Sequence, residues 1–364
     1  MKPMNRHRPK VRPGRGSRSV PRSEVAAARQ VPTPRAASGF PSPADLGKAD
    51  SPPLDFAILC ERYRDAPGGV GFDPRRSAEA IAERLRVSPA TVRRRLTAWR
   101  TGGFFLGYDV LPHPSLWGGR WSARILEFPD AVTQGQAVRP LSLIDGVIQI
   151  VPSRNLLLAV YFVDSEAQSE RRLLQLREIP GPKEVGPEMP FPLQPCTWRM
   201  TRSDWRMVRA LRRAPEAPLA ALALGVGQSQ RTVSRRLNSL LDANAVMFDP
   251  VLDFSRFSQT VAVVSAILSS PERTEAVRSQ IRELSPHAQP SSGPTVVDAD
   301  DQARSVQFLA SGRTAAELDE WSARVERIPG VERALLWYEQ CSVPVRDWLD
   351  DRIERELASG RTGN

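Results

Sequence analysis

Two short segments carry residue types that can read nucleic acid. Residues 91–96 are Thr-Val-Arg-Arg-Arg-Leu, and residues 232–237 are Thr-Val-Ser-Arg-Arg-Leu. An arginine guanidinium can bond guanine O6 and N7 together, a contact that discriminates between bases by about 1–3 kcal/mol. Both segments follow the pattern Thr-Val-x-Arg-Arg-Leu, so the same chemistry is offered twice in one chain.

Each segment is expected on a helix that follows a tight turn. Ser88 is a typical N-cap and Pro89 suits the first helical position, so a helix should start here and end near Arg100, before two glycines. A preceding helix over 77–85 completes the pattern of a helix-turn-helix. The second copy predicts helices over 198–211, 219–224 and 228–243.

Helical spacing separates an inward face from an outward face in both segments. Val92, Leu96 and Trp99 should face a core in the first copy, and Val233, Leu237 and Leu240 in the second. Arg93 and Arg94 are expected at base edges, whereas Ser88 and Thr91 are expected at phosphates. The candidate DNA-binding residues are Ser88, Pro89, Ala90, Thr91, Arg93, Arg94, Arg95, Gln228, Gln230, Arg231, Thr232, Ser234, Arg235 and Asn238.

A structural interpretation of the arginines competes with this one. A run of three arginines on a helix is usually a solvated face. Arg95 and Arg236 can also form ion pairs with acids such as Glu83 or Asp242 and so serve the fold. The preceding helix, the Ser-Pro start and the second copy favour DNA reading.

A stretch of alternating strand and helix patterns follows each of the two helical units. Each has the order βαββαβ, which predicts a ferredoxin-like sandwich of four antiparallel strands with two helices on one face. Ile-Pro-Gly precedes the last strand in both. The segments 104–111 and 245–252 are predicted as β-wings. The first stretch predicts strands over 121–128, 146–151 and 155–163, a short last strand, and helices over 131–143 and 166–178. The second predicts strands over 260–268, 295–298, 305–311 and 332–338, with helices over 273–284 and 314–327.

Charge is concentrated at the N-terminus. The chain has a formal net charge of +10, and residues 1–53 contain eleven basic and three acidic side chains. This segment is rich in Pro, Arg, Ser and Gly, so it should not bury enough apolar surface to fold. It is predicted to be a disordered basic tail, either an arm that approaches DNA or a solvated extension.

Several function classes find no support in the residues. The longest apolar run, residues 156–163, is too short to span a membrane, and no secretory signal is visible. The cysteines Cys60, Cys196 and Cys341 are isolated, and His7, His113 and His287 have no partner at ligand or catalytic spacing. We therefore expect no catalytic residues, no metal and no cofactor, and a protein that is not an enzyme.

Taken together, these motifs resemble the Lrp/AsnC family of transcription regulators. The resemblance rests on residues 85–96, on the stretch 103–111 and on the helix-Ile-Pro-Gly-strand endings at 166–187 and 315–338, and it covers about 54–340 twice over. It implies a small, amino acid-like effector and a homo-oligomer formed through the ferredoxin-like modules. The chain departs from the family at Ser153-Arg154-Asn155, where a Gly-x-x-Asp pattern near the effector pocket is usual.

The sequence thus predicts an α+β fold in which two winged helix-turn-helix domains alternate with two ferredoxin-like βαββαβ domains, pseudo-duplicated in one chain. The expected function is sequence-specific binding of double-stranded DNA by a cytoplasmic, nucleoid-associated transcription regulator that acts as a covalent pseudo-dimer. The alternative is a protein–protein interaction scaffold that uses winged helices without binding DNA. The expected domains are a tail (1–53), helix-turn-helix 1 (54–118), effector module 1 (119–195), helix-turn-helix 2 (196–256), effector module 2 (257–345) and a C-terminal helix and tail (346–364).

Overall fold

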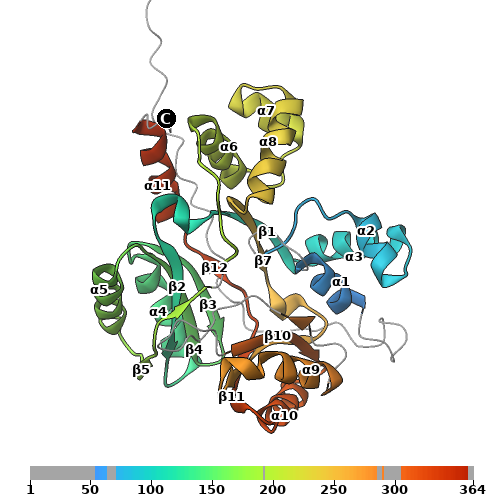
Figure 1. Cartoon of the computed structure of the whole chain (residues 1–364), viewed down its shortest axis with the longest axis vertical. Helices are drawn as coiled ribbons and strands as arrows, with labels where there is room; N and C mark the ends of the chain where they lie inside the picture. The colour runs from blue at the N-terminus through green and yellow to red at the C-terminus, as the bar shows by residue number, and fades with distance from the viewer. Residues whose placement is uncertain (1–53, 64–70, 192, 285–288, 291–304, 360–364) are drawn as a thin grey trace, which may run out of the picture. The chain divides into compact units, whose positions relative to one another are not determined.

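The computed structural model describes residues 54–63, 71–191, 193–284, 289–290 and 305–359 (Figure 1). The predicted tail over 1–53 and the predicted strand over 295–298 lie outside these residues. The described chain combines helices with antiparallel sheets, so the α+β class is confirmed. The same order of elements occurs twice, as a three-helix unit, a long strand and a sheet module.

The two three-helix units follow the predicted plan with shifted starts. Thr201 and Asp204 form a capping box, so α6 begins at Arg202 rather than at Trp198 as predicted. Ser229 caps α8, so the predicted start at Gln228 is wrong by two residues. The first unit contains α1 (Leu54–Tyr63), α2 (Ala78–Leu85) and α3 (Pro89–Thr101). The second contains α6 (Arg202–Arg213), α7 (Leu219–Val226) and α8 (Gln230–Asp242).

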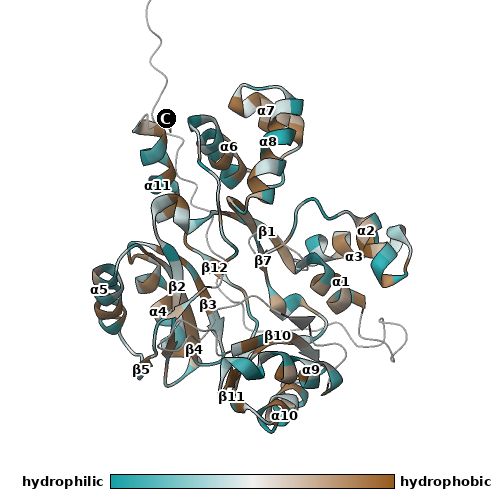
Figure 2. Cartoon of the chain, in the orientation of Figure 1, coloured by the Kyte–Doolittle hydropathy of each residue, from teal (hydrophilic) through white to brown (hydrophobic). Residues whose placement is uncertain are grey.

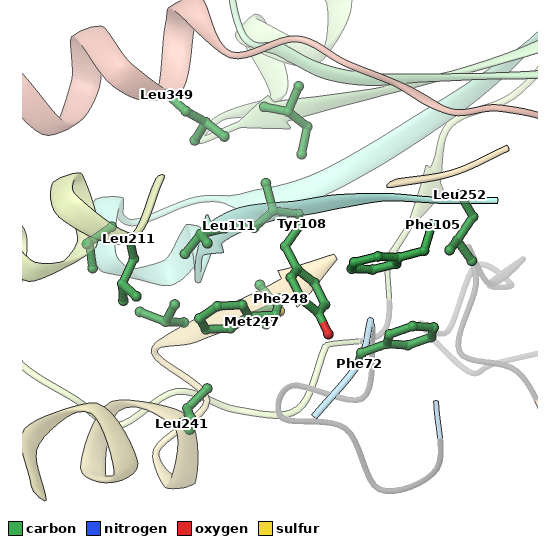
Figure 3. Close-up of a cluster of buried hydrophobic side chains, with 14 of the residues drawn as sticks. Phe72, Phe105, Tyr108, Leu111, Leu211, Leu241, Met247, Phe248, Leu252 and Leu349 are labelled. Carbon is green, nitrogen blue, oxygen red and sulfur yellow. The ribbon is translucent and has the colours of Figure 1, made fainter. Parts of the chain in front are cut away.

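The two predicted wings are not separate hairpins in the described chain. β1 (Phe105–Pro112) and β7 (Val246–Leu252) pair with each other as an antiparallel two-stranded ribbon. Side chains from both strands enter one apolar cluster, shown in Figure 3 with Tyr108 and Phe248 among the labelled residues. Pairing across the chain buries both strands, which a small solvent-facing wing would not do.

In each sheet module the first strand is an inner strand of the sheet, and it is followed by a helix, two strands, a second helix and a return to the sheet. In the first, the strand order is β3-β4-β2-β5, with two-residue edge strands that match the prolines around them. The second has the order β11-β8-β10-β9. The first module contains β2 (Arg120–Glu127), α4 (Ala131–Ser142), β3 (Val147–Ser153), β4 (Leu156–Val163), α5 (Glu166–Arg177), β5 (Glu184–Val185) and β6 (Met189–Pro190). The second contains β8 (Thr260–Leu268), α9 (Thr274–Leu284), β9 (Gln289–Pro290), β10 (Ser305–Gly312), α10 (Ala315–Glu326) and β11 (Val331–Tyr338).

The apolar core is divided among three clusters. One fills the helix-covered side of each sheet, and the third joins both three-helix units, the ribbon and the opposite faces of the sheets. In Figure 2 most of α6 is coloured hydrophilic, whereas much of the ribbon strand β7 is coloured hydrophobic. Chain segments after β11 also reach the first module, since β12 (Val343–Pro344) pairs with β3 and α11 (Asp347–Ala358) packs on α6 and β3.

Candidate nucleic-acid interface

Helix α3 is started and oriented by local contacts that the sequence specifies. The Ser88 side chain accepts a hydrogen bond from the Thr91 backbone N–H at 3.1 Å, and Pro89 occupies the first turn. Val92 is fully buried and Trp99 is 7% exposed, so the opposite face of the helix meets solvent. The first turn contains no acidic residue, which leaves the positive end of the helix dipole available to an anion.

The outward face of α3 presents the two arginines expected to read bases. Arg93 and Arg94 are both exposed, as is Ala90. Arg93 donates to Glu79 of α2, and both side chains of this pair are more than half exposed. Solvent and salt screen an exposed ion pair of this kind, so a phosphate or a base edge could replace Glu79 at little cost.

Arg95 lies on the other side of the helix and has a different role. Its Nη1 is 3.2 Å from Asp55 of α1, and the Trp99 indole N–H donates to the same carboxylate at 3.1 Å. The Arg95 side chain is 32% exposed, compared with 58% for Arg93. Arg95 therefore braces α3 against α1. The acidic partner of Arg95 is therefore Asp55, whereas the structural interpretation of the sequence names Glu83 as an example.

A matching brace holds α8 against α6. Arg236 donates through Nε and Nη2 to Asp204, whose side chain is fully buried, and Nη2 also donates to the Thr201 hydroxyl at 2.6 Å. Burial would raise the pKa of Asp204, but hydrogen bonds from Arg236 and Thr201 outweigh it and lower that pKa. The partner again differs from the one named from sequence, which was Asp242. That carboxylate instead pairs with Arg75, at 2.5 Å.

Helix α8 offers a different set of polar side chains from α3. Gln230, Arg231, Arg235 and Asn238 are exposed, whereas Ser234 is half-buried. As in α3, the first turn contains no acidic residue. The outward face of α8 can therefore donate and accept hydrogen bonds at positions where α3 carries other residue types.

The predicted residues Ser88, Thr91, Thr232 and Gln228 lie at the N-terminal ends of these helices. Ser229 caps α8 in the way that Ser88 caps α3, with its oxygen accepting from the Thr232 N–H at 3.2 Å. The hydroxyls of Ser229 and Thr232 lie 2.9 Å apart, and those of Ser88 and Thr91 2.8 Å apart. Gln228 lies before α8 and donates to the Ser203 hydroxyl at 2.6 Å. Its amide is thus turned toward the protein rather than toward solvent.

Sequence reasoning offered ion pairs for Arg95 and Arg236 but missed their partners, although a signal was present. Asp55 is followed by Phe56 and Asp204 by Trp205, in the first turn of the first helix of each unit. An acid followed by an aromatic residue thus occupies the same point in both three-helix units. The pairing itself depends on how two helices pack, which local spacing does not specify.

Neither a metal site nor a membrane span emerges from the described part of the chain. Its His, Cys, Asp and Glu side chains form no group of three or more arranged to hold a metal ion. His113 bonds Ser115 and the Gln194 carbonyl, and burial lowers its pKa. None of the helices described is both long and apolar enough to cross a bilayer.

Comparison with known proteins gives distant structural likenesses. No family model and no curated protein matches the sequence. The siroheme decarboxylase NirDL, solved with an iron-uroporphyrin III analogue, is 14% identical with a TM-score of 0.46, covering 84% of this chain and 99% of that one. Escherichia coli AsnC is 16% identical with a TM-score of 0.26, covering 40% of this chain and 95% of its own. A transcriptional regulatory protein of the AsnC family from Pyrococcus furiosus is 18% identical with a TM-score of 0.27, covering 40% and 89%.

Proposed function

We propose that this chain binds double-stranded DNA in a sequence-specific manner and regulates transcription. In this proposal the three-helix units are helix-turn-helix domains, and α3 and α8 are their recognition helices. The sheet modules are ferredoxin-like domains that carry them, and the chain acts as a covalent pseudo-dimer. The N-terminal halves of α3 and α8 would enter the major groove, where a helix fits and base edges can be read.

One observation carries this proposal. In both units a repeated arrangement fixes the recognition helix from behind, through Arg95 with Asp55 and Arg236 with Asp204. Arg94 and Arg235, each one residue earlier, remain exposed. A helix that is locked on its inner face and presents guanidinium groups outward is suited to rigid docking in a groove.

Each predicted contact then takes a specific role. Arg93, Arg94, Arg231, Arg235, Gln230 and Asn238 are proposed at base edges or adjacent phosphates. Ser88, Pro89, Ala90, Thr91, Thr232 and Ser234 are proposed to approach the backbone close to the helix N-termini. Arg95 and Gln228 are proposed as positioning residues because both bond protein groups.

The ribbon supplies the connection that a two-headed DNA-binding protein needs. β1 follows α3 and β7 follows α8, and the two strands pair directly. The open faces of both sheets contribute to the same apolar cluster, for example Val160 and Leu309. Homo-oligomerisation through those sheet faces, the form expected from sequence, would compete with this internal packing. Light scattering of the purified protein would give its oligomeric state.

Binding-site selection from random duplexes, followed by a gel shift, tests the proposal. The double variant Arg94→Ala and Arg235→Ala should lose specific binding by at least about 30-fold, because each of the two guanine contacts contributes about 1–3 kcal/mol. Arg139→Ala with Arg171→Ala is the matched control, since it removes two exposed arginines from the sheet module. Equal losses in both double variants would contradict the assignment.

Salt titration distinguishes the alternative, a scaffold that uses the same helices for protein partners. DNA affinity should fall steeply as salt rises from about 50 to 200 mM, because phosphate contacts release counterions. Removing residues 1–53, which carry most of the net positive charge, should reduce that slope. Specific DNA binding that is absent at low salt would favour the scaffold.

A further inference from the structure

A cluster of polar side chains lies beneath α5 in the first sheet module. At its centre is the carboxylate of Glu188, in the segment between β5 and β6. Its Oε1 accepts from the Ser122 hydroxyl at 2.7 Å and from Arg120 Nη2 at 3.0 Å. Its Oε2 accepts from the Ser169 hydroxyl and lies 3.6 Å from Arg124 Nη2. Four side chains from β2 and α5 therefore surround one carboxylate.

Three of the four groups around this carboxylate are buried, whereas the Arg120 side chain is 47% exposed. Ser122 is fully buried, Ser169 is 3% exposed and Arg124 is 8% exposed. Burial would raise the pKa of Glu188, but the hydrogen bonds from Ser122, Ser169 and Arg120 more than offset it and lower that pKa. The cluster is thus built to stabilise a negative charge inside the protein.

Glu188 does not use all the hydrogen-bonding capacity of the cluster. The Tyr161 hydroxyl and the Nε atoms of Arg124 and Arg172 are buried and have no hydrogen-bond partner in the structure. Burial raises the pKa of Tyr161 to about 12, with Arg124 and Arg172 acting in the opposite direction, so the phenol stays protonated and can donate. Buried donors without partners are uncommon in folded proteins, and here three of them lie in one cluster.

The second sheet module shows that the fold does not need these polar groups. In the first module the strand register places Ser122 opposite Tyr161. At the corresponding place in the second module, Ala262 lies opposite Ala310. These two alanines belong to the apolar cluster beneath α10.

The helices repeat this contrast between the modules. Ser165 and Thr314 are the N-caps of α5 and α10, so Ser169 and Arg172 of α5 correspond to Leu318 and Trp321 of α10. Both α10 residues are buried in an apolar core. Replacing buried charges with apolar side chains is often neutral or stabilising, so retention of two buried arginines in the first module calls for a role beyond folding.

We propose that this cluster is a binding site for the carboxylate of a small organic acid, and that Glu188 is a tethered occupant which the ligand displaces. The ligand carboxylate would take the place of the Glu188 carboxylate between Ser122, Ser169 and Arg124. The Tyr161 hydroxyl and Arg172 would bond further polar atoms of the ligand. This proposal concerns the sheet module alone and stands or falls independently of DNA binding.

Few hydrogen bonds hold residues 186–188, the segment that carries Glu188. Beyond its carboxylate, the Gly186 N–H donates to the Ile125 carbonyl at 2.8 Å, and Arg124 Nη1 donates to the Gly186 carbonyl at 2.9 Å. The strands on either side, β5 and β6, are two residues long. Short edge pairings of this kind can open without unfolding the sheet.

Acetate and formate are the probes for this site in the full-length chain. Glu188→Ala empties the carboxylate position, so acetate should bind the variant with a Kd in the millimolar range and raise its Tm above that in chloride of equal ionic strength. Wild type should bind acetate at least about tenfold more weakly, because Glu188 competes at a high effective concentration. Glu184→Ala removes an exposed acid from β5 and should behave as wild type.

Further variants keep the test decisive if Glu188→Ala fails to fold. Glu188→Gln keeps the packing but removes the negative charge, so its Tm should also rise more in acetate than in chloride. Adding Arg124→Met to either variant should abolish the acetate response. The proposal is overturned if the response to acetate equals that to chloride, if wild type and Glu188→Ala bind acetate equally, or if Arg124→Met leaves binding unchanged in a folded protein.

Discussion

Asp109 and Asp249 lie directly opposite each other in the β1–β7 ribbon. The two carboxylates have different surroundings. Asp109 is 3.3 Å from Arg212 Nη1 and 3.5 Å from Arg346 Nε, whereas Asp249 accepts from the Gln149 side-chain amide at 2.8 Å. Burial raises the pKa of both, and burial together with the charge of Asp109 raises that of Asp249 to about 7. One acid of the pair is therefore compensated by arginines and the other is not.

This arrangement predicts that stability falls as pH rises through the range below neutrality. The folded protein keeps the Asp249 proton up to about pH 7, whereas the unfolded chain releases it near the ordinary pKa of 3.8. The free energy of unfolding should therefore decrease between about pH 4 and pH 7 and then level off. Burial and Asp249 raise the pKa of Glu339 to about 7, which adds to the same trend.

Asp249→Asn tests this prediction by removing the titration while keeping the size of the side chain. Its urea midpoint should exceed that of wild type at pH 8, and its decrease between pH 5 and pH 8 should be smaller. Glu339→Gln should act in the same direction, and Glu170→Gln, at an exposed position on α5, serves as the control. Among the described residues, the other titratable groups facing Asp249 are Tyr63 and Asp109. A decrease as steep in Asp249→Asn as in wild type would exclude this residue as the source.

The braces behind α3 and α8 should differ in strength. Asp204→Ala leaves Arg236 facing a buried gap and should cost about 3–5 kcal/mol of unfolding free energy. Asp55 is 13% exposed at its side chain and Arg95 is 32% exposed, so Asp55→Ala should cost less. Urea denaturation at pH 7.5 measures both values.

An exposed pair on the same unit provides the control for the braces. Arg93 and Glu79 are 58% and 59% exposed, so Glu79→Ala should leave the unfolding free energy almost unchanged. The expected order of destabilisation is Asp204→Ala, then Asp55→Ala, then Glu79→Ala. If Glu79→Ala proved as costly as Asp204→Ala, the braces would have no special part in holding the helices.

The helices and most strands could be predicted because their signals are local. Ser88 and Pro89 mark the start of α3, and the strand predicted over 260–268 is observed as β8 (Thr260–Leu268). The partners of Arg95 and Arg236 could not be predicted, because each acid lies on a helix far away in sequence. Their proximity is set by tertiary packing rather than by helical period.

The pairing of β1 with β7 could not be predicted from local sequence patterns either. An alternating pattern specifies a strand but not its neighbour, and Phe105 pairs with Leu252, far along the chain. The cluster around Glu188 was hidden as well. Its members come from β2, β4, α5 and the β5–β6 segment, and in the sequence each is an isolated polar residue.

Under the proposed function, α3 and α8 should read an operator with unlike halves. Counted from their N-caps, Arg94 and Arg235 are equivalent, but Arg93 corresponds to Ser234 and Ala90 to Arg231. The exposed guanidinium groups therefore lie at different positions along α3 and α8. Direct readout by the two helices should favour different bases in the two halves of the operator. Site selection should return a non-palindromic sequence. Arg94→Ala should relax preference in one half and Arg235→Ala in the other, whereas a symmetric palindrome would contradict unequal reading.

Gly71 makes a contact with the ribbon that no other residue type can make. Its φ is +74°, and a Cβ built there would lie 2.2 Å from the Phe248 carbonyl oxygen. That oxygen accepts from the Phe72 N–H at 2.8 Å, and both aromatic side chains belong to the cluster in Figure 3. Gly103 is the matched control, with φ of +77° and nothing within 4 Å of a Cβ added at that position. Gly103→Ala should cost about 1 kcal/mol from backbone strain alone. Gly71→Ala must also displace β7, so its loss of unfolding free energy should be clearly greater than that of Gly103→Ala. Equal urea midpoints for the two variants would contradict this prediction, because they would show that β7 can shift without a loss of stability.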